Sequence, residues 1–267
     1  MSANRNRGGS PRFSISQNFL TSAGTISRLL RLTSISKDDH VIEIGAGKGH
    51  ITRRLAHMCR RLDAYEIDPG LWPALLALRE AAPNLTVKRQ DFLTAALPPG
   101  GEYKVFGNIP FSRTSDIIKK LTNAKNPPIE AWLLMEHGAA KRFAGAPQAR
   151  RDTLGSLLIK PFFDSRIVCR VPRFEFHPAP SVDAALLHLV KKTPPDIQAT
   201  QKREFERFIE RGMRYGAESQ LTKRQIGAAL RLAGLPDTRQ SALMRYVQWL
   251  CLFRYYLALR GSDKPSK

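Results

Sequence analysis

The chain has 267 residues and a mass of 30.0 kDa, enough for one large domain or for a medium-sized domain with a small one beside it. No apolar run approaches the ~20 residues of a membrane span, and the N-terminus lacks the apolar stretch of a secretion signal, so we expect a soluble, cytoplasmic protein. The three cysteines are widely spaced and form no CxxC pair, which predicts neither a disulfide framework nor a metal site.

The charge is the most informative feature of the composition. Lys and Arg number 43 against 23 Asp and Glu, which gives a formal net charge of +20. A partner with many negative charges is expected, and nucleic acid is the leading candidate. A basic surface that only aids solubility and an anionic membrane face are the alternatives, and no strongly basic amphipathic segment favours the membrane.

The first part of the chain alternates between two kinds of element. Residues 1–12 are rich in Gly, Arg and Asn and are predicted to be a disordered basic arm. After a helix near 22–35, short apolar runs typical of strands alternate with segments of helical periodicity, which predicts a largely parallel sheet wound by helices. The predicted strands are 40–45, 62–67, 85–89, 103–107 and 129–135, and the predicted helices between them are 49–60, 69–82 and 112–122.

The second part of the chain changes character. Two more predicted strands, 163–171 and 183–190, flank the Pro-rich turn RFEFHPAPS, and from about residue 196 apolar residues recur at helical spacing. Pro194 and Pro195 mark the change. We therefore predict an α/β fold with a Rossmann-like domain over 13–195 and a small all-helical domain over 196–267.

A glycine-rich turn follows the first predicted strand, in the stretch VIEIGAGKGHITRRL. Gly45, Gly47 and Gly49 let the backbone pass close to a ligand, and Glu66, at the end of the next strand, is placed to bind the two hydroxyls of a ribose. A dinucleotide fingerprint would need glycine where the chain has His50, so the spacing favours a nucleoside without a pyrophosphate. Glycines that serve packing only are the alternative interpretation.

The third strand ends in RQDFL, which offers a further contact for such a nucleoside. Asp91 can accept a hydrogen bond from the exocyclic amino group of an adenine, and Phe92 lies beside it. A turn or helix-capping aspartate is the alternative.

The fourth strand ends in the tetrad Asn108, Ile109, Pro110 and Phe111. In an α/β sheet, ligands bind beyond the carboxyl ends of the strands, so the Asn108 amide and the carbonyls of the Ile109–Pro110 unit could accept both N–H groups of an aromatic amine. This would localise the nitrogen lone pair and direct it at an electrophile such as a sulfonium methyl, while Phe111 stacks on a base removed from its helix. An ordinary Asn-Pro turn with a core phenylalanine is the alternative.

Together these motifs resemble the Erm family, the erythromycin-resistance rRNA adenine N6-methyltransferases. The resemblance covers nearly the whole chain in the family's order. It rests on SQNFL at 16–20, EIGAGKG at 43–49, EID at 66–68, QDFL at 90–93, NIPFSRTSDIIKKL at 108–121 and FHPAPSVDAALL at 176–187.

The resemblance implies a class I methyltransferase domain with S-adenosylmethionine as cofactor and no metal. It also implies that Phe176 lies against the target adenine opposite Phe111, although a core aromatic is the alternative. Many relatives have Tyr at the position of Phe111. Any role of a tyrosine hydroxyl is therefore absent here, and stacking alone must hold the base. The predicted catalytic residues are Asn108, Ile109, Pro110, Phe111 and Phe176. The predicted cofactor site comprises Asn18, Leu20, Glu43, Gly45, Gly47, Glu66, Ile67, Asp91, Phe92 and Asn108.

The implied activity is N6-methylation of one adenine in 23S rRNA, protein-free or partly assembled, with resistance to macrolide, lincosamide and streptogramin B antibiotics. We expect a monomer with no membrane partner. The small-subunit rRNA adenine dimethyltransferases share most of these motifs and are one alternative. A catalytically idle RNA-binding module on the same fold is another.

Overall fold

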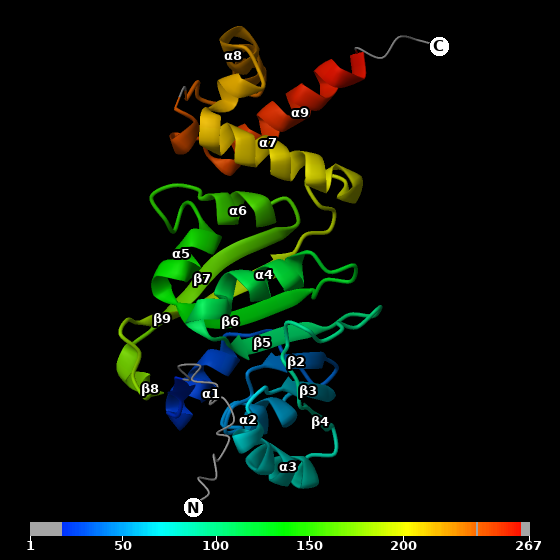
Figure 1. The fold of residues 1–267 in the computed structure, drawn as a ribbon, viewed down its shortest axis with the longest axis vertical. Coiled ribbons are helices and arrows are strands. Elements are labelled where there is room, and N and C mark those ends of the chain that lie inside the picture. Colours follow the sequence, from blue (N-terminus) through cyan, green and yellow to red (C-terminus); the bar gives the residue numbers. More distant parts are fainter. Residues whose placement is uncertain (1–17, 239, 263–267) are drawn as a thin grey trace, which may run out of the picture.

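The computed structural model describes residues 18–238 and 240–262, so the predicted basic arm lies outside the described residues. Its main feature is a seven-stranded sheet in the order β4-β3-β2-β5-β6-β9-β7 (Figure 1). The strands are β2 (His40–Ile44), β3 (Arg61–Tyr65), β4 (Leu85–Lys88), β5 (Lys104–Asn108), β6 (Glu130–Glu136), β7 (Phe163–Val171) and β9 (Ala184–Lys191).

The sheet is largely parallel, which confirms the prediction from the alternating pattern. Strands β4, β3, β2, β5 and β6 pair in parallel, and β9 is antiparallel to both of its neighbours, β6 and β7. The parallel strands therefore all end at one edge of the sheet. Strand β5 ends one residue later than expected, so Asn108 is its last residue.

Helices cover both faces of the sheet. On one face the side chains of α1 (Ala23–Arg31), α2 (Thr52–Ala56) and α3 (Trp72–Ala81) pack with strand residues such as Val41 and Phe106. On the other, α4 (Thr114–Thr122) and α5 (His137–Ala144) pack with Ile42 and Val105. The alternation of neighbouring residues between the two cores follows from the two-residue period of a strand.

Three features differ from the sequence prediction. Helix α2 is much shorter than the predicted 49–60, because Gly49 has φ +81° and belongs to the turn before the helix. Helices α5 and α6 (Leu154–Ile159) were not predicted. A two-residue ladder of β1 (Phe19–Leu20) and β8 (Phe176–His177) was also missed, because so short a pair has no periodicity to detect.

Several single 3-10 turns connect these elements. They are Pro69–Leu71 before α3, Phe111–Arg113 before α4, Arg173–Glu175 before β8, Ala199–Gln201 before α7, Ala217–Ser219 and Ser241–Leu243. The first two complete the predicted helices at 69–82 and 112–122.

The C-terminal region is helical, as its periodicity predicted, and lies at one end of the molecule (Figure 1). Helices α7 (Lys202–Tyr215), α8 (Lys223–Leu232) and α9 (Tyr246–Ser262) enclose an aromatic core that includes Phe208, Trp249 and Phe253. Leu157 of α6 joins this core, so the helical region is packed against the sheet region. No helix among the described residues is long and apolar enough to cross a membrane.

The packing of α7 against α9 generates a stability prediction. A Cβ on Gly212 would lie 2.5 Å from Cζ3 of the fully buried Trp249 ring. We expect Gly212→Ala to lower the free energy of unfolding in urea, because overpacking a rigid ring costs about 1–3 kcal/mol and exceeds the ~0.5–1 kcal/mol that alanine adds in a helix. Gly24→Ala in α1 meets nothing within 4 Å and should not destabilise. Equal effects of the two changes would contradict this account.

Candidate active site

The glycine-rich turn after β2 requires glycine at two points of close approach. Gly45 has φ +73° and Gly47 has φ +56°, a region that side chains disfavour. A Cβ on Gly45 would lie 3.2 Å from the Asn108 carbonyl oxygen, and one on Gly47 would lie 2.9 Å from the Phe19 ring. The turn therefore packs directly against the end of β5 and against β1.

Glu66, directly after β3, holds this turn in place. Its Oε2 accepts a hydrogen bond from the Gly47 amide at 2.7 Å, and its Oε1 accepts one from the Asp68 amide at 2.8 Å. Burial raises the pKa of this carboxyl, which is 4% exposed, and the two amide hydrogen bonds act in the opposite direction. Each oxygen keeps a lone pair that can accept a hydrogen bond from a hydroxyl group of a ligand.

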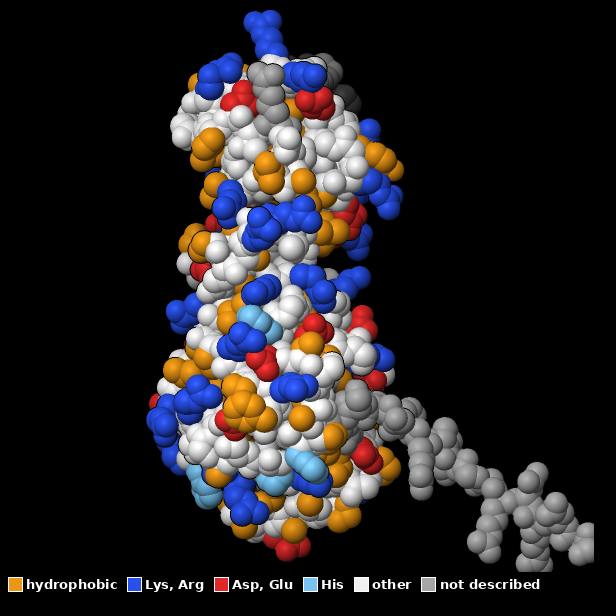
Figure 2. Space-filling model, turned by 90° about the vertical axis from the view of Figure 1, so that its left-hand side faces the viewer, with side chains coloured by type: hydrophobic (Ala, Val, Ile, Leu, Met, Phe, Trp, Pro, Cys, Tyr) orange, Lys and Arg blue, Asp and Glu red, His pale blue; other side chains and the backbone are white. Residues whose placement is uncertain are grey.

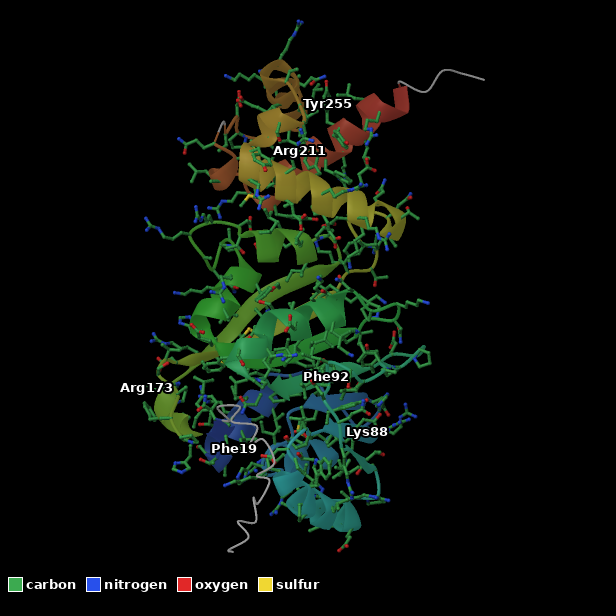
Figure 3. The ribbon with its side chains drawn as sticks, in the orientation of Figure 1. Phe19, Lys88, Phe92, Arg173, Arg211 and Tyr255 are labelled. Atoms are coloured by element: carbon green, nitrogen blue, oxygen red, sulfur yellow. The ribbon has the colours of Figure 1, made fainter. Side chains whose placement is uncertain are left out.

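A cleft of about 560 Å³ lies beyond the carboxyl ends of β2, β3, β4 and β5. Figure 3 labels two of its lining residues, Phe19 from β1 and Phe92 from the turn after β4. Segments that are far apart in the sequence thus meet at one site. The predicted site residues among the lining are Asn18, Gly45, Gly47, Glu66, Ile67, Asp91, Phe92, Asn108, Ile109, Pro110 and Phe111.

Asp91 and Phe92 form one wall of the cleft. Asp91 Oδ1 accepts a hydrogen bond from the Leu93 amide at 2.8 Å, so the residue does stabilise a turn, as the alternative interpretation proposed. Its Oδ2 has no hydrogen-bond partner within the described part of the chain and is free for a ligand. The Phe92 ring meets Tyr65 edge-on, with centroids 5.4 Å apart, which fixes the ring plane.

Asn108 projects its side chain into the cleft from the end of β5. Its Nδ2 donates a hydrogen bond to the Asn18 carbonyl oxygen at 2.8 Å, and because a carbonyl can only accept, the orientation of the amide is determined. The Oδ1 atom has no partner in the described residues. The Pro110 carbonyl accepts from the Arg113 amide at 3.0 Å, whereas the Ile109 carbonyl has no partner there either. Two free acceptors therefore lie on consecutive residues.

Three predicted site residues do not line the cleft. Leu20 and Phe176 pair across the β1–β8 ladder and are buried in the core, with Phe176 only 3% exposed. Phe111, by contrast, lines the cleft and is half-buried. The third residue is Glu43 in β2. The proposed roles of Leu20, Glu43 and Phe176 stay predictions.

Glu43 is a buried carboxyl in the middle of the sheet. It is 1% exposed, and neither of its oxygens has a hydrogen-bond partner among the residues that the structure describes. Burial raises its pKa to about 8, and the nearby Thr52 hydroxyl, which makes no hydrogen bond of normal geometry with any described residue, acts in the opposite direction. The side chain is therefore mainly neutral at pH 7.

Several residues that line the cleft are not among the predicted site residues. These are Phe19, Ile44, Tyr65, Gln90, Leu93, Ser112, Arg113 and Ile117. Most are apolar or aromatic, and nothing in a sequence separates such a residue from an ordinary core residue. Phe19 lies in β1, a strand of two residues that is too short for its sequence to show which residue faces the cleft.

The fold and the cleft together define a class of protein. The cleft combines a glycine turn tied to a buried carboxylate, an aspartate and an aromatic ring in the turn after β4, and an amide at the end of β5. Such a set suits a nucleoside ligand. With one antiparallel strand, β9, inserted between β6 and β7 of an otherwise parallel sheet, this is the architecture of class I S-adenosylmethionine-dependent methyltransferases.

Comparisons with known proteins agree with this class. Residues 9–234 match the model of the ribosomal RNA adenine dimethylase family. An rRNA adenine N-6-methyltransferase of Lysinibacillus sphaericus is 31% identical over 92% of this chain and 97% of its own length. The ribosomal RNA small subunit methyltransferase A of Prosthecochloris aestuarii is 36% identical over 73% of this chain and 74% of its own. The crystal structure of the 23S rRNA methyltransferase ErmE superposes with a TM-score of 0.78 at 30% identity, covering 90% of this chain and 99% of that one.

The chain therefore belongs to the ribosomal RNA adenine dimethylase family, and its resemblance to the Erm enzymes is confirmed. It is an S-adenosylmethionine-dependent rRNA adenine N6-methyltransferase. The residues of the cleft fit that cofactor, because Glu66 keeps free lone pairs for two ribose hydroxyls and Asp91 Oδ2 can accept a hydrogen bond from an adenine amino group.

The buried Glu43 generates a pH prediction. Its folded-state pKa of about 8 exceeds the ordinary 4.5, so folding favours the protonated form, and stability falls as pH rises from about 5 towards 8. Glu43→Gln removes this dependence, so the variant should gain free energy of unfolding relative to wild type across that range. Urea unfolding at several pH values measures the difference, with Glu80→Gln on the exposed face of α3 as the control. A difference that does not change with pH would contradict the assignment.

Proposed function

We propose that this enzyme methylates N6 of one adenine in the peptidyl-transferase region of 23S rRNA, and thereby confers resistance to macrolide, lincosamide and streptogramin B antibiotics. The observation that most supports this is the similarity to ErmE, a 23S rRNA methyltransferase, over nearly the whole of both chains. The small-subunit methyltransferase is matched over a smaller part of this chain, which makes small-subunit rRNA the second candidate.

The two free acceptors at the end of β5 support a role in activating the adenine amine. An exocyclic amino group has a delocalised lone pair and two N–H groups. Asn108 Oδ1 and the Ile109 carbonyl can accept one hydrogen bond each and so localise the lone pair on nitrogen. Asn18 holds the Asn108 amide in the accepting orientation before any substrate binds. S-adenosylmethionine, when bound, supplies the electrophilic methyl group.

The proposed stacking of the target base uses Phe111 first, because this ring lines the cleft. Phe176 packs in the same hydrophobic cluster as Phe111 but is buried. A direct contact between Phe176 and the adenine requires the β1–β8 ladder to shift when RNA binds.

The basic surface supports an RNA substrate over both parts of the molecule. Figure 2 shows Lys and Arg side chains distributed over one face from the sheet region, across the narrow middle, to the helical region. Arg150 and Arg151 between α5 and α6, and Arg207 and Arg211 on α7, are exposed and have no carboxylate partner within the described residues. We propose that the enzyme binds RNA as a monomer, before ribosome assembly is complete, with residues 196–267 as a second domain and without a membrane partner.

Methyl transfer from labelled cofactor to isolated rRNA tests the substrate. Protein-free large-subunit and small-subunit rRNA are offered separately, and the modified base is mapped. We expect one labelled adenine in the large-subunit RNA. Labelling of small-subunit RNA alone would replace the proposal with the second candidate.

The cofactor roles of Glu66 and Asp91 predict the effect of removing each carboxylate. Glu66→Ala and Asp91→Ala should weaken cofactor binding by about ten- to a hundred-fold, because a hydrogen bond to a charged group contributes about 1.5–3 kcal/mol. Calorimetry measures the dissociation constant. Asp38→Ala, an exposed carboxylate at the opposite end of β2, is the matched control and should leave affinity unchanged. Unchanged affinity in both test variants would reject the pocket assignment.

The proposed role of Asn108 predicts a loss of turnover without a loss of binding. Asn108→Ala should lower the single-turnover rate by about 10²–10³-fold, the typical effect of removing one oriented group that acts in the transition state. RNA affinity should stay close to normal, because one contact is lost from a large electrostatic interface. Rapid-quench kinetics at saturating cofactor measures the turnover rate, and RNA binding measured on the same sample separates this effect from an effect on RNA affinity. A near-normal rate would end this mechanism.

A further inference from the structure

Phe174 is an aromatic side chain with no place in the core. It lies in the 3-10 turn Arg173–Glu175 between β7 and β8, and it is 77% exposed. Single exposed apolar residues are common on protein surfaces, so the case for a function rests on where this ring lies and on what surrounds it. Neither the cleft nor the predicted catalytic tetrad includes it.

The turn that presents Phe174 is anchored on both sides. The Arg173 amide donates to Asp183 Oδ1 at 2.9 Å, and the Glu175 amide donates to the Pro172 carbonyl at 3.1 Å. The Glu175 carboxylate accepts from the Thr25 hydroxyl of α1 at 2.8 Å. The ring is therefore held in solvent by an ordered backbone, which is the arrangement that a preformed binding surface needs.

The turn is close to the mouth of the cleft. His177 pairs with Phe19, which lines the cleft, and paired strands lie about 5 Å apart. Phe174 is three residues before His177, so its Cα lies within roughly 15 Å of that of Phe19, since a residue spans at most about 3.6 Å. Figure 3 shows Arg173 of this turn and Phe19 towards the same side of the molecule. A few nucleotides of an unpaired RNA strand can span this distance.

The surroundings of Phe174 carry charges of both signs. Arg170 and Arg173 are exposed, and the neighbouring carboxylates are those of Glu175 and Asp183. Arg170 pairs with Asp183 at 2.6 Å, whereas the Arg173 guanidinium has no carboxylate partner within residues 18–238 and 240–262. A flat ring next to unpaired positive charge matches the two needs of single-stranded RNA, a stacking face for a base and a cation for its phosphate.

We propose that Phe174 is a stacking platform for an unpaired rRNA nucleotide a few positions from the methylated adenine. This inference rests on the rRNA adenine methylation described above and adds a second base contact outside the cleft. The contact would position the RNA strand so that the target adenine enters the cleft. Phe174 is a positioning residue in this account, because it touches neither the reacting atoms nor the cofactor.

Variants of Phe174 test this proposal. The RNA is a hairpin fragment of whichever rRNA the wild-type enzyme methylates, and binding is measured at one fixed salt concentration without cofactor. We expect Phe174→Ala to weaken binding by about 5- to 150-fold, the range for loss of one stacked base. Phe174→Trp should bind with nearly wild-type affinity, because tryptophan keeps an aromatic face. Phe174→Leu should bind as weakly as Phe174→Ala, because leucine keeps the apolar surface but has no ring. The unfolding midpoint of all three should stay unchanged.

The matched control is Tyr215→Ala, which removes a second exposed aromatic ring, 67% exposed, beside Arg214 in the helical region. It should leave affinity for the hairpin unchanged. Wild-type affinity in Phe174→Leu would overturn the proposal, because apolar surface without an aromatic ring would then account for the contact with the RNA. An equal loss in Tyr215→Ala would overturn it as well, since any exposed ring would then serve.

A protein–RNA mutant cycle locates the stacked base. Each unpaired nucleotide near the target is replaced in turn by an abasic one, and the effect of Phe174→Ala is measured again. At one position the abasic change should remove the difference between wild type and Phe174→Ala. A difference that persists at every position would overturn the proposal. Failure to label large-subunit RNA would instead contradict the proposed substrate, and the cycle would then use the RNA that is labelled.

Discussion

The parallel register of three neighbouring strands is the constraint on which the active site depends. Ile44 of β2 pairs with Tyr65 of β3 on one side and with Gly107 of β5 on the other. Gly45, Glu66 and Asn108 are each the next residue along their strand. Hydrogen bonding of the sheet therefore brings a backbone turn, a carboxylate and an amide to one edge, although they are far apart in the sequence. A slip of one residue in either pairing would turn these side chains to the opposite face of the sheet.

Hydrogen bonds within the protein then orient these groups before a ligand arrives. Glu66 binds the Gly47 and Asp68 amides, and Asn18 accepts from the Asn108 amide. Each functional group is left with a free acceptor that points where a ligand can use it. Such preorganisation lowers the cost of reorganisation during the reaction, and it explains why a segment as early as residue 18 has to pack against the end of β5.

The antiparallel strands extend this site towards the substrate. Strand β9 reverses direction beside β6, and the connection from β7 places the Pro-rich turn against β1. The turn thus lies beside a wall of the cleft and presents Phe174 and the Arg173 guanidinium to solvent. The carboxyl ends of the parallel strands line the cleft, and the appended turn lies beside it. In the proposed function this turn faces the RNA together with Arg150 and Arg151 and the arginines of α7.

The sequence alone determined the class of fold, the helical C-terminal region, the glycine turn with Glu66 and Asp91, and the tetrad at Asn108. These features depend on local order: apolar periodicity sets the strands, and motif residues follow strand ends at short, regular distances. Apart from predicted residues such as Phe92 and Phe111, the apolar lining of the cleft was decided only by the tertiary structure, because Phe19 and Tyr65 differ from core aromatic residues solely in what packs against them. Tertiary structure likewise paired Leu20 with Phe176 and buried Glu43 without a partner, since contacts across long sequence separations leave no trace in local pattern.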